Sequence, residues 1–485
     1  MVMGETAVST ELVVVGGGPG GYATAFRAAQ RGLDTTLVSD EAAGLGGVCL
    51  LRGCIPSKAL LEMTGRMDRA REAAEAGIRF GDPEVDLDAL RDWTGEVVRG
   101  LVEGLGELAE ARGVRVVEGR GRFESSSRLR VLDADVTEVE FEHAVVAAGA
   151  RPVALPDVPF GGAVWDSARA LELPEVPDRL LVVGAGYVGL EMATVYARLG
   201  SAVTVVEEED RILPLADPEL AAPLARRLEG LLEELRLETR VRSLEAEEDG
   251  VVAELGGDGE RFDRVLVAVG RAPATEELGL EETEVTRDDD GFLVVDEERR
   301  TRDPRIFAVG DCTAGKGLAH EAMGQGKVAA DVIAGEAAAW DPRAIPAVVY
   351  TDPQVAWCGL TEAEAREGGG EVRVARFPLA ASGRARTMAG SATDGLVKLV
   401  ADDHGRLLGA GFTGPHVESL VAEAALALEM GATAADLALT IHPHPTLSEP
   451  LAEAAELLEG VPTHVAAPDG HDRGGTAAPR SEEEA

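Results

Sequence analysis

Lysine is scarce in this chain of 485 residues. Four lysines, at positions 58, 316, 327 and 398, stand among 46 basic residues that face 87 Asp and Glu, giving a formal net charge of −41. That charge argues against nucleic acid or an anionic membrane surface as the main partner. A codon bias towards Arg would explain why lysines are few, but it would not explain the excess of acidic residues. We therefore favour a protein from a salt-rich cytoplasm. There the repulsion between carboxylates is screened, because the Debye length shrinks to about 3 Å at 1 M salt.

Cysteines and long apolar runs are also few. Four cysteines do not make a disulfide framework, and no apolar run approaches the roughly 18 residues that span a bilayer. The N-terminus shows no secretory signal, so we expect a cytoplasmic protein. Apolar residues make up 45 % of the chain, which excludes wholesale disorder, and the length predicts about three domains at roughly 150 residues each.

Two glycine-rich turns each stand between a β-branched run and an Ala-rich helical pattern. The first has glycines 16, 18 and 21, and the second has glycines 184, 186 and 189. In this G-x-G-x-x-G spacing the first glycine permits a tight turn, the second admits a pyrophosphate, and the third lets helix and strand pack closely. The helix N-terminus then attracts the phosphates. Two copies in the same context predict two dinucleotide sites.

The residue types that follow each turn differ. Glu207 stands 18 residues after Gly189, where an acid binds the ribose hydroxyls of NAD and repels the 2′-phosphate of NADP. The equivalent position after Gly21 is Ser39, with Asp40 and Glu41 just beyond it. The first site therefore either uses a displaced acid or holds its ribose differently.

Two cysteines lie five residues apart, soon after the first turn. Cys49 and Cys54 are not spaced as a closed zinc site, which needs four ligands, so no metal is expected. In a protein without signs of export such a pair is redox-active more often than structural, although two inert buried thiols remain an alternative. Cys312 and Cys358 stand alone beside apolar runs and fit that inert reading.

A His-rich segment near the C-terminus could supply a base. Thiolates are the nucleophiles in thiol exchange, and His444, followed by Glu449, has the residue types for an oriented acid–base. Sequence spacing does not show that it meets the cysteines. The polar segment from residue 463 is expected to be disordered, with His464 and His471 solvated.

Together these residues resemble the FAD-dependent pyridine nucleotide–disulfide oxidoreductases over about residues 9–461. The resemblance rests on five segments: Gly46 to Lys58, Gly184 to Glu191, Gly310-Asp311, Leu318 to His320, and His444 to Glu449. It implies an α/β fold with two Rossmann-like dinucleotide-binding domains and a C-terminal α+β dimerisation domain. The implied ranges are 1–150 and 273–344 for FAD, 151–272 for NAD, 345–462 for the homodimer interface and 463–485 for a tail.

The resemblance also implies roles. Cys49 would exchange with substrate, Cys54 would lie next to the flavin, Lys58 would pair with Glu191, and His444, oriented by Glu449, would act from the other subunit. The implied FAD residues are Gly16, Gly18, Gly21, Ser39, Asp40, Lys58, Gly149, Asp311 and Ala319. The implied NAD residues are Gly184, Gly186, Gly189, Glu207 and Gly270.

Within the family the chain is most similar to the branch that oxidises protein-bound dihydrolipoyl groups. That branch implies a lipoyl partner on the acyltransferase core of a 2-oxoacid dehydrogenase or glycine cleavage complex.

Some residues of the chain depart from the usual pattern of the family. They are Val48, Leu51, Arg52, Ala148 and Ser39. Arg52 could stabilise a nearby thiolate or attract an anionic substrate. We favour the simpler interpretation, in which it points to solvent or pairs with a carboxylate. The alternative function is an NAD(P)H-dependent reductase of a small disulfide such as bis-γ-glutamylcystine. A mercuric reductase function is not favoured, because the sequence lacks the paired C-terminal cysteines of that enzyme.

Overall fold

The computed structural model describes residues 7–247, 249–257, 259–388 and 390–466. Its first sheet has the order β3-β2-β1-β6-β5-β4, with β17 also paired to β6. Helices α1 and α8 pack against each other, and α8 comes from a segment almost 300 residues after α1. The elements are β1 (Ala7–Val15), α1 (Pro19–Gln30), β2 (Thr35–Ser39), α2 (Gly47–Arg52), α3 (Cys54–Glu72), α4 (Leu87–Ala111), β3 (Arg115–Glu118), β4 (Arg120–Ser125), β5 (Arg128–Leu132), β6 (Glu138–Val146), η1 (Leu280–Glu282), β17 (Ile306–Ala308), η2 (Gly310–Cys312) and α8 (Ala319–Ile333).

The second sheet repeats this plan with parallel strands in the order β11-β10-β9-β15-β8. An antiparallel pair, β7 with β16, marks where the chain leaves the first domain and returns to it. The elements are β7 (Ala150–Pro152), β8 (Val164–Trp165), α5 (Ser167–Leu171), β9 (Arg179–Val183), α6 (Tyr187–Leu199), β10 (Ala202–Val206), α7 (Pro218–Leu231), β11 (Glu234–Arg236), β12 (Ser243–Glu247), β13 (Gly250–Glu254), β14 (Glu260–Phe262), β15 (Arg264–Val267) and β16 (Arg271–Pro273).

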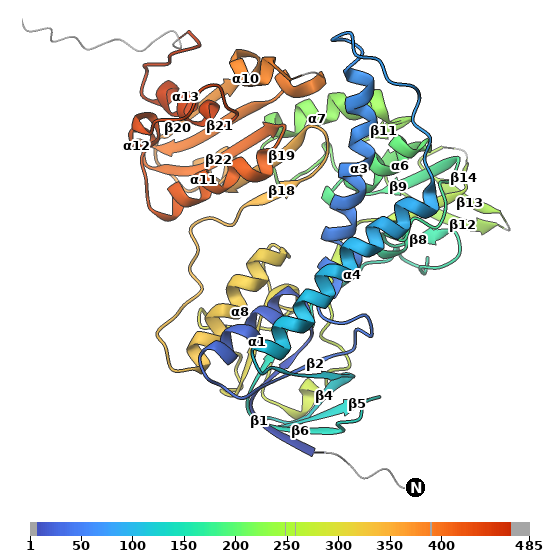
Figure 1. Cartoon of the computed structure of the whole chain (residues 1–485), viewed down its shortest axis with the longest axis vertical. Coiled ribbons are helices and arrows are strands. Elements are labelled where there is room, and N and C mark those ends of the chain that lie inside the picture. The colour runs from blue at the N-terminus through green and yellow to red at the C-terminus, as the bar shows by residue number, and fades with distance from the viewer. Residues whose placement is uncertain (1–6, 248, 258, 389, 467–485) are drawn as a thin grey trace, which may run out of the picture.

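The C-terminal domain is an antiparallel sheet in the order β18-β19-β22-β21-β20, with helices packed on it (Figure 1). The expected α/β fold with a C-terminal α+β domain is therefore confirmed. The elements are β18 (Ala347–Val349), β19 (Gln354–Gly359), α9 (Glu362–Glu367), β20 (Val372–Pro378), η3 (Leu379–Ala381), α10 (Gly383–Arg386), η4 (Gly390–Thr393), β21 (Leu396–Asp402), β22 (Leu407–Gly414), α11 (Val417–Glu429), α12 (Ala434–Leu439) and α13 (Glu449–Leu458).

The central strands β1 and β9 pair in parallel with both of their neighbours and are buried on both faces. In β1 the continuous run Leu12–Val15 is at most 5 % exposed, and in β9 the run 180–182 is completely buried. Such unbroken apolar runs are typical of parallel sheets covered by helices on both sides. Each run ends directly at a glycine turn, so the core fixes where the turns lie. Over the same described ranges, no helix is both long and apolar enough to cross a membrane.

A fully buried lysine joins the second and C-terminal domains. Lys398 of β21 is 1 % exposed, and its Nζ lies 2.6 Å from Glu219, 2.9 Å from Glu362 and 3.1 Å from Asp217. Burial alone would raise the pKa of Glu362, but the hydrogen bonds from Lys398 and Arg366 outweigh it and lower that pKa to about 2. The cluster is therefore an ion-pair network with the buried Lys398 at its centre, while Arg366 and Arg376 bind Glu362 from the more exposed side.

We predict that Lys398→Met lowers the free energy of unfolding by about 3–5 kcal/mol, because it leaves the buried Asp217 carboxylate without its cation. Denaturant unfolding at constant KCl measures this, with exposed Lys327→Met as the matched control. The stability that Glu362 contributes is present above its ordinary pKa of 4.5 and is lost as pH falls towards about 2. The acid-side loss of stability should therefore be shallower in Lys398→Met. Equal stability of the two variants at neutral pH would contradict the role of Lys398.

Candidate active site

The two glycine turns share one construction. Gly16 and Gly184, with φ of +113° and +104°, begin the turns in a backbone region that favours glycine. A Cβ on Gly21 would stand 1.8 Å from the carbonyl oxygen of Gly16, and one on Gly189 would stand 2.0 Å from that of Gly184. Only glycine therefore allows α1 and α6 to begin so close to their strands.

A cavity of about 470 Å³ extends from the first turn to the cysteine pair. Its lining includes the predicted residues Gly16, Gly18, Asp40, Lys58, Gly149, Asp311 and Ala319. Burial raises the pKa of the Asp311 carboxyl in this wall. Bare glycine backbone at a helix N-terminus and carboxylates further along fit the pyrophosphate and hydroxyl groups of a dinucleotide.

Ser39 does not line this cavity. It is 5 % exposed, and a Cβ on Gly17 would stand 2.6 Å from its Oγ, so its side chain lies under the glycine turn. The neighbouring Asp40 and Glu41 do line the cavity. Of the two alternatives left open by the sequence, this placement favours the displaced acid.

A second cavity of about 1020 Å³ lies over the second turn. Gly184, Gly186, Glu207 and Gly270 line it. The Glu207 carboxylate accepts hydrogen bonds from the backbone N–H of Ala185 at 2.7 Å and of Glu209 at 3.1 Å. It is therefore fixed at the end of β10, where a ribose acid is expected.

The two cavities share part of their walls. Tyr187, Arg271 and Asp311 line both of them. Burial raises the pKa of Tyr187 to about 12, so this residue is a neutral phenol at the shared wall. Tyr187 and Arg271 were not predicted as site residues. Tyr187 stands inside the second glycine motif, and that position was the available signal.

The cysteine pair faces the first cavity. Cys49 of α2 and Cys54, the first residue of α3, are free thiols with sulfurs 2.7 Å apart. The hydrogen bond from Cys49 lowers the pKa of Cys54 to about 7, against the effect of burial and with help from the charge of Lys58. The same contact, with burial, raises the pKa of Cys49. The reduced pair therefore holds one thiolate, on Cys54, near neutral pH.

Lys58 is held beside the thiols by a buried acid. Its Nζ donates to Glu191 Oε2 at 2.8 Å and Oε1 at 3.0 Å, and Glu191 is 3 % exposed. The Tyr350 N–H also donates to Glu191 at 3.1 Å, and the Tyr350 ring centroid lies 4.5 Å from Lys58 Nζ. The predicted Lys58–Glu191 contact is present, and Tyr350 is a neighbour that the sequence did not reveal.

His444 and Glu449 contact each other, as expected from their spacing. His444 Nδ1 lies 2.7 Å from Glu449 Oε1, and the Thr446 N–H donates to Oε2 at 2.6 Å. Burial would raise the pKa of Glu449, but these hydrogen bonds lower it. The pair stands at the start of α13, far from α3 in Figure 1, and the His444 side chain is 71 % exposed. One chain therefore does not bring His444 to its own cysteines.

Three other expectations concern single side chains. The Arg52 guanidinium is paired with Glu41 (Nη1 to Oε2, 2.7 Å), which confirms the favoured reading. Cys312 and Cys358 are buried, and burial raises their pKa values to about 11 and about 12, as inert thiols require. His464 is 55 % exposed, as the solvated reading expects, and its ring also pairs with Glu453, a partner that the sequence did not reveal. His471 and most of the predicted tail lie outside the described residues.

Comparison with known proteins identifies the class. The family model described as pyridine nucleotide-disulphide oxidoreductase matches residues 10–326, and the dimerisation domain of the same family matches residues 345–455. The chain therefore belongs to the pyridine nucleotide–disulfide oxidoreductases, as the sequence predicted, and its cofactors are FAD and NAD.

Three similar proteins from different organisms are named dihydrolipoyl dehydrogenase. The chain is 45 % identical to dihydrolipoyl dehydrogenase of Haloferax volcanii over 96 % of this chain and 99 % of that protein. It is 46 % identical to that of Halobacterium salinarum with the same coverage, and 44 % identical to that of Vibrio parahaemolyticus over 93 % and 96 %. Among solved structures, LpdA from Mycobacterium tuberculosis has a TM-score of 0.85 at 29 % identity, covering 92 % of this chain and 99 % of LpdA.

We predict that Glu207→Ala raises the KM for NAD⁺ at least about tenfold with little change in kcat, because a hydrogen bond to a charged group contributes about 1.5–3 kcal/mol. The preference for NAD⁺ over NADP⁺ should narrow as well. Steady-state kinetics with both nucleotides measure this. Glu229→Ala removes an equal charge from an exposed position on α7 and should change neither value. An unchanged KM in Glu207→Ala would contradict the placement of the ribose.

Proposed function

We propose that this chain is a dihydrolipoyl dehydrogenase. The observation that carries the proposal is the Cys49–Cys54 pair, with the pKa of Cys54 near 7, in the wall of one dinucleotide cavity that adjoins a second. The similarity to dihydrolipoyl dehydrogenases over nearly the whole chain supports the same substrate. This proposal includes the domain ranges and the roles of the site residues that were predicted from the sequence.

The thiol chemistry follows from the positions of the two sulfurs. In the oxidised enzyme, a dihydrolipoyl thiolate attacks Cys49 of the Cys49–Cys54 disulfide, and Cys54 leaves as a thiolate beside the Lys58 ammonium. The second substrate thiolate then breaks the mixed disulfide, which releases the lipoyl disulfide and leaves Cys49 reduced. The first cavity would hold FAD and the second NAD⁺, and together these cofactors would supply the acceptor for the electron pair of the Cys49–Cys54 dithiol.

The proton from each substrate thiol needs a base. His444 is oriented by Glu449 but exposed, so we place it in the active site of a second copy of the chain, which makes each site composite. Large apolar side chains are exposed on the same C-terminal domain, as a dimer face requires. They are Leu426, Met430, Leu439 and Ile441.

We propose a lipoyl domain as the macromolecular partner, carried by the acyltransferase core of a 2-oxoacid dehydrogenase or glycine cleavage complex in the cytoplasm. The acidic surface and the haloarchaeal relatives support a halophilic enzyme that needs high salt. The Arg52–Glu41 pairing weakens the alternative of a small anionic disulfide, because the guanidinium already has its carboxylate.

The test is turnover by the FAD-loaded protein in multimolar KCl. Dihydrolipoamide with NAD⁺ should yield NADH, and Cys49→Ser should lower this rate at least about a thousandfold because the attacked sulfur is gone. Cys358→Ala removes a buried sulfur elsewhere and should retain the rate.

Two results would contradict the proposal. One is fast NAD(P)H-dependent reduction of bis-γ-glutamylcystine without turnover of dihydrolipoamide, which would establish the alternative. The other is full turnover by Cys49→Ser, which would remove the mechanism.

A further inference from the structure

Two ion pairs join helices α3 and α6. Near the cysteines, Lys58 of α3 binds Glu191 of α6. Further along both helices, Arg198 Nε of α6 donates to Asp68 Oδ2 of α3 at 2.7 Å. Glu191 and Arg198 are seven residues apart, so they lie on one face of α6 about 10 Å from each other.

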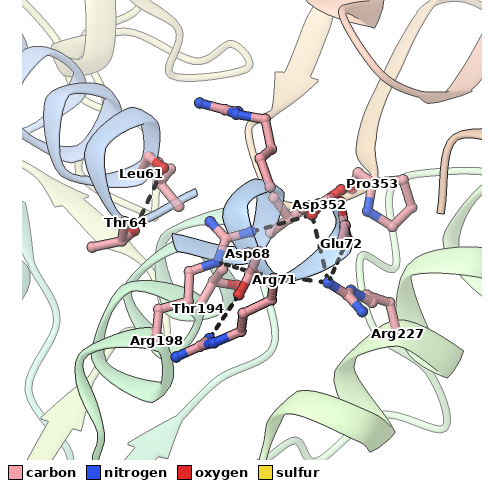
Figure 2. Close-up of polar contacts among 12 residues, drawn as sticks. Leu61, Thr64, Asp68, Arg71, Glu72, Thr194, Arg198, Arg227, Asp352 and Pro353 are labelled. Carbon is pink, nitrogen blue, oxygen red and sulfur yellow. Dashed lines mark hydrogen bonds and ion pairs between the residues drawn. The ribbon is translucent and has the colours of Figure 1, made fainter. Parts of the chain in front are cut away.

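The second pair is the more deeply buried one. The Arg198 and Asp68 side chains are 4 % and 8 % exposed, and Figure 2 shows them within a cluster of carboxylates and guanidiniums. A Cβ on Gly65 would stand 3.4 Å from Arg198 Nη1, which is ordinary van der Waals contact, so the guanidinium lies directly against α3 at Gly65. A buried ion pair adds little net stability, but the rigid guanidinium fork fixes direction.

A third segment, residues 350–352, contacts both ion pairs. The Tyr350 N–H binds Glu191 at 3.1 Å, and Arg198 Nη2 donates to Asp352 Oδ2 at 3.3 Å. Arg227 of α7 approaches from the other side, with its Nη2 3.3 Å from Glu72 and 3.9 Å from Asp352. Three segments from different parts of the chain are therefore fixed to one another at two points.

We propose that Arg198 is a positioning residue: by binding Asp68 and Asp352 it fixes how α3 lies on α6, and so holds the Lys58 ammonium beside Cys54. The inference deepens the proposed function, on which it rests. Helices fixed at one point can tilt about it, and active-site groups need to be held within about 0.5 Å of their working geometry. Arg198 acts through Lys58, because the contacts of its guanidinium are with Asp68, Asp352 and Gly65 rather than with the sulfurs.

The readout is the pKa of the Cys54 thiol. The titratable or charged groups that influence it or lie around it are Cys49, Lys58, Glu191, Tyr22, Tyr187 and Tyr350. The rate of alkylation of Cys54 by iodoacetamide is measured against pH in the full-length, FAD-loaded Cys49→Ser protein in multimolar KCl. Mass spectrometry of the Cys54 peptide separates it from Cys312 and Cys358.

In this background we expect Arg198→Gln to raise the pKa of Cys54 by about one unit, which lowers the alkylation rate below neutral pH about tenfold. Arg198→Lys retains the charge and should recover at least half of the shift. The matched control is Arg71→Gln, because Arg71 binds the other oxygen of Asp68 at 3.2 Å from α3 itself and does not join the helices. It should leave the pKa unchanged.

Folding of each variant is checked by flavin content and far-ultraviolet circular dichroism. If Arg198→Gln does not fold, the double variant Asp68→Asn/Arg198→Gln, which removes both charges, should show the same shift. An unchanged pKa in either folded variant, or an equal shift in Arg71→Gln, would overturn the proposal. No dihydrolipoyl substrate enters this titration, so its outcome is separate from that of the turnover assay.

Discussion

The ion pair between Lys58 and Glu191 is the interaction on which the site depends. Lysine is rare in this acidic chain, yet one lies within reach of the cysteine pair, held by a carboxylate that is 3 % exposed. The pair joins α3, which begins at Cys54, to α6, which begins at the second glycine turn. It therefore links thiol chemistry to the position of the second dinucleotide cavity. Breaking it would leave both a buried carboxylate and a thiolate without their cation.

The chain divides its charge between surface and site. The acids of the segments 207–210, 245–247 and 287–300 are mostly exposed or partly exposed. The glycine turns and the segment 47–58 contain no acid, and their only charged side chains are Arg52 and Lys58. Screening by salt weakens repulsion between exposed charges and acts much less on buried pairs. An acidic surface suited to high salt can thus coexist with ion pairs such as Asp68–Arg198, which need no salt to form.

Local motifs predicted much of the site, and contacts across long sequence separations did not follow from the sequence. The glycine turns, Glu207 and the cysteine pair were predictable because a strand, a turn and a helix that are adjacent in sequence place them. Ser39 shows that distance in sequence from the glycine turn does not locate the ribose-binding residue by itself. The strand keeps the Ser39 side chain in the core, and the cavity wall begins one residue later. Arg271, Tyr350 and the Asp68–Arg198 pair depend on how separate domains pack. The partner of the exposed His464 was not foreseen because Glu453 is supplied by α13, 11 residues earlier in the chain.

The most direct test of the account is the pKa of the Cys54 thiol in Lys58→Met, measured in the reduced, FAD-loaded protein. Charge and geometry together predict a rise of about one unit or more above the value near 7, because the thiolate loses its nearest cation while the hydrogen bond from Cys49 remains. The same pKa in Lys58→Met and in the parent protein would contradict the claim that the Lys58 ammonium helps to lower the pKa of Cys54.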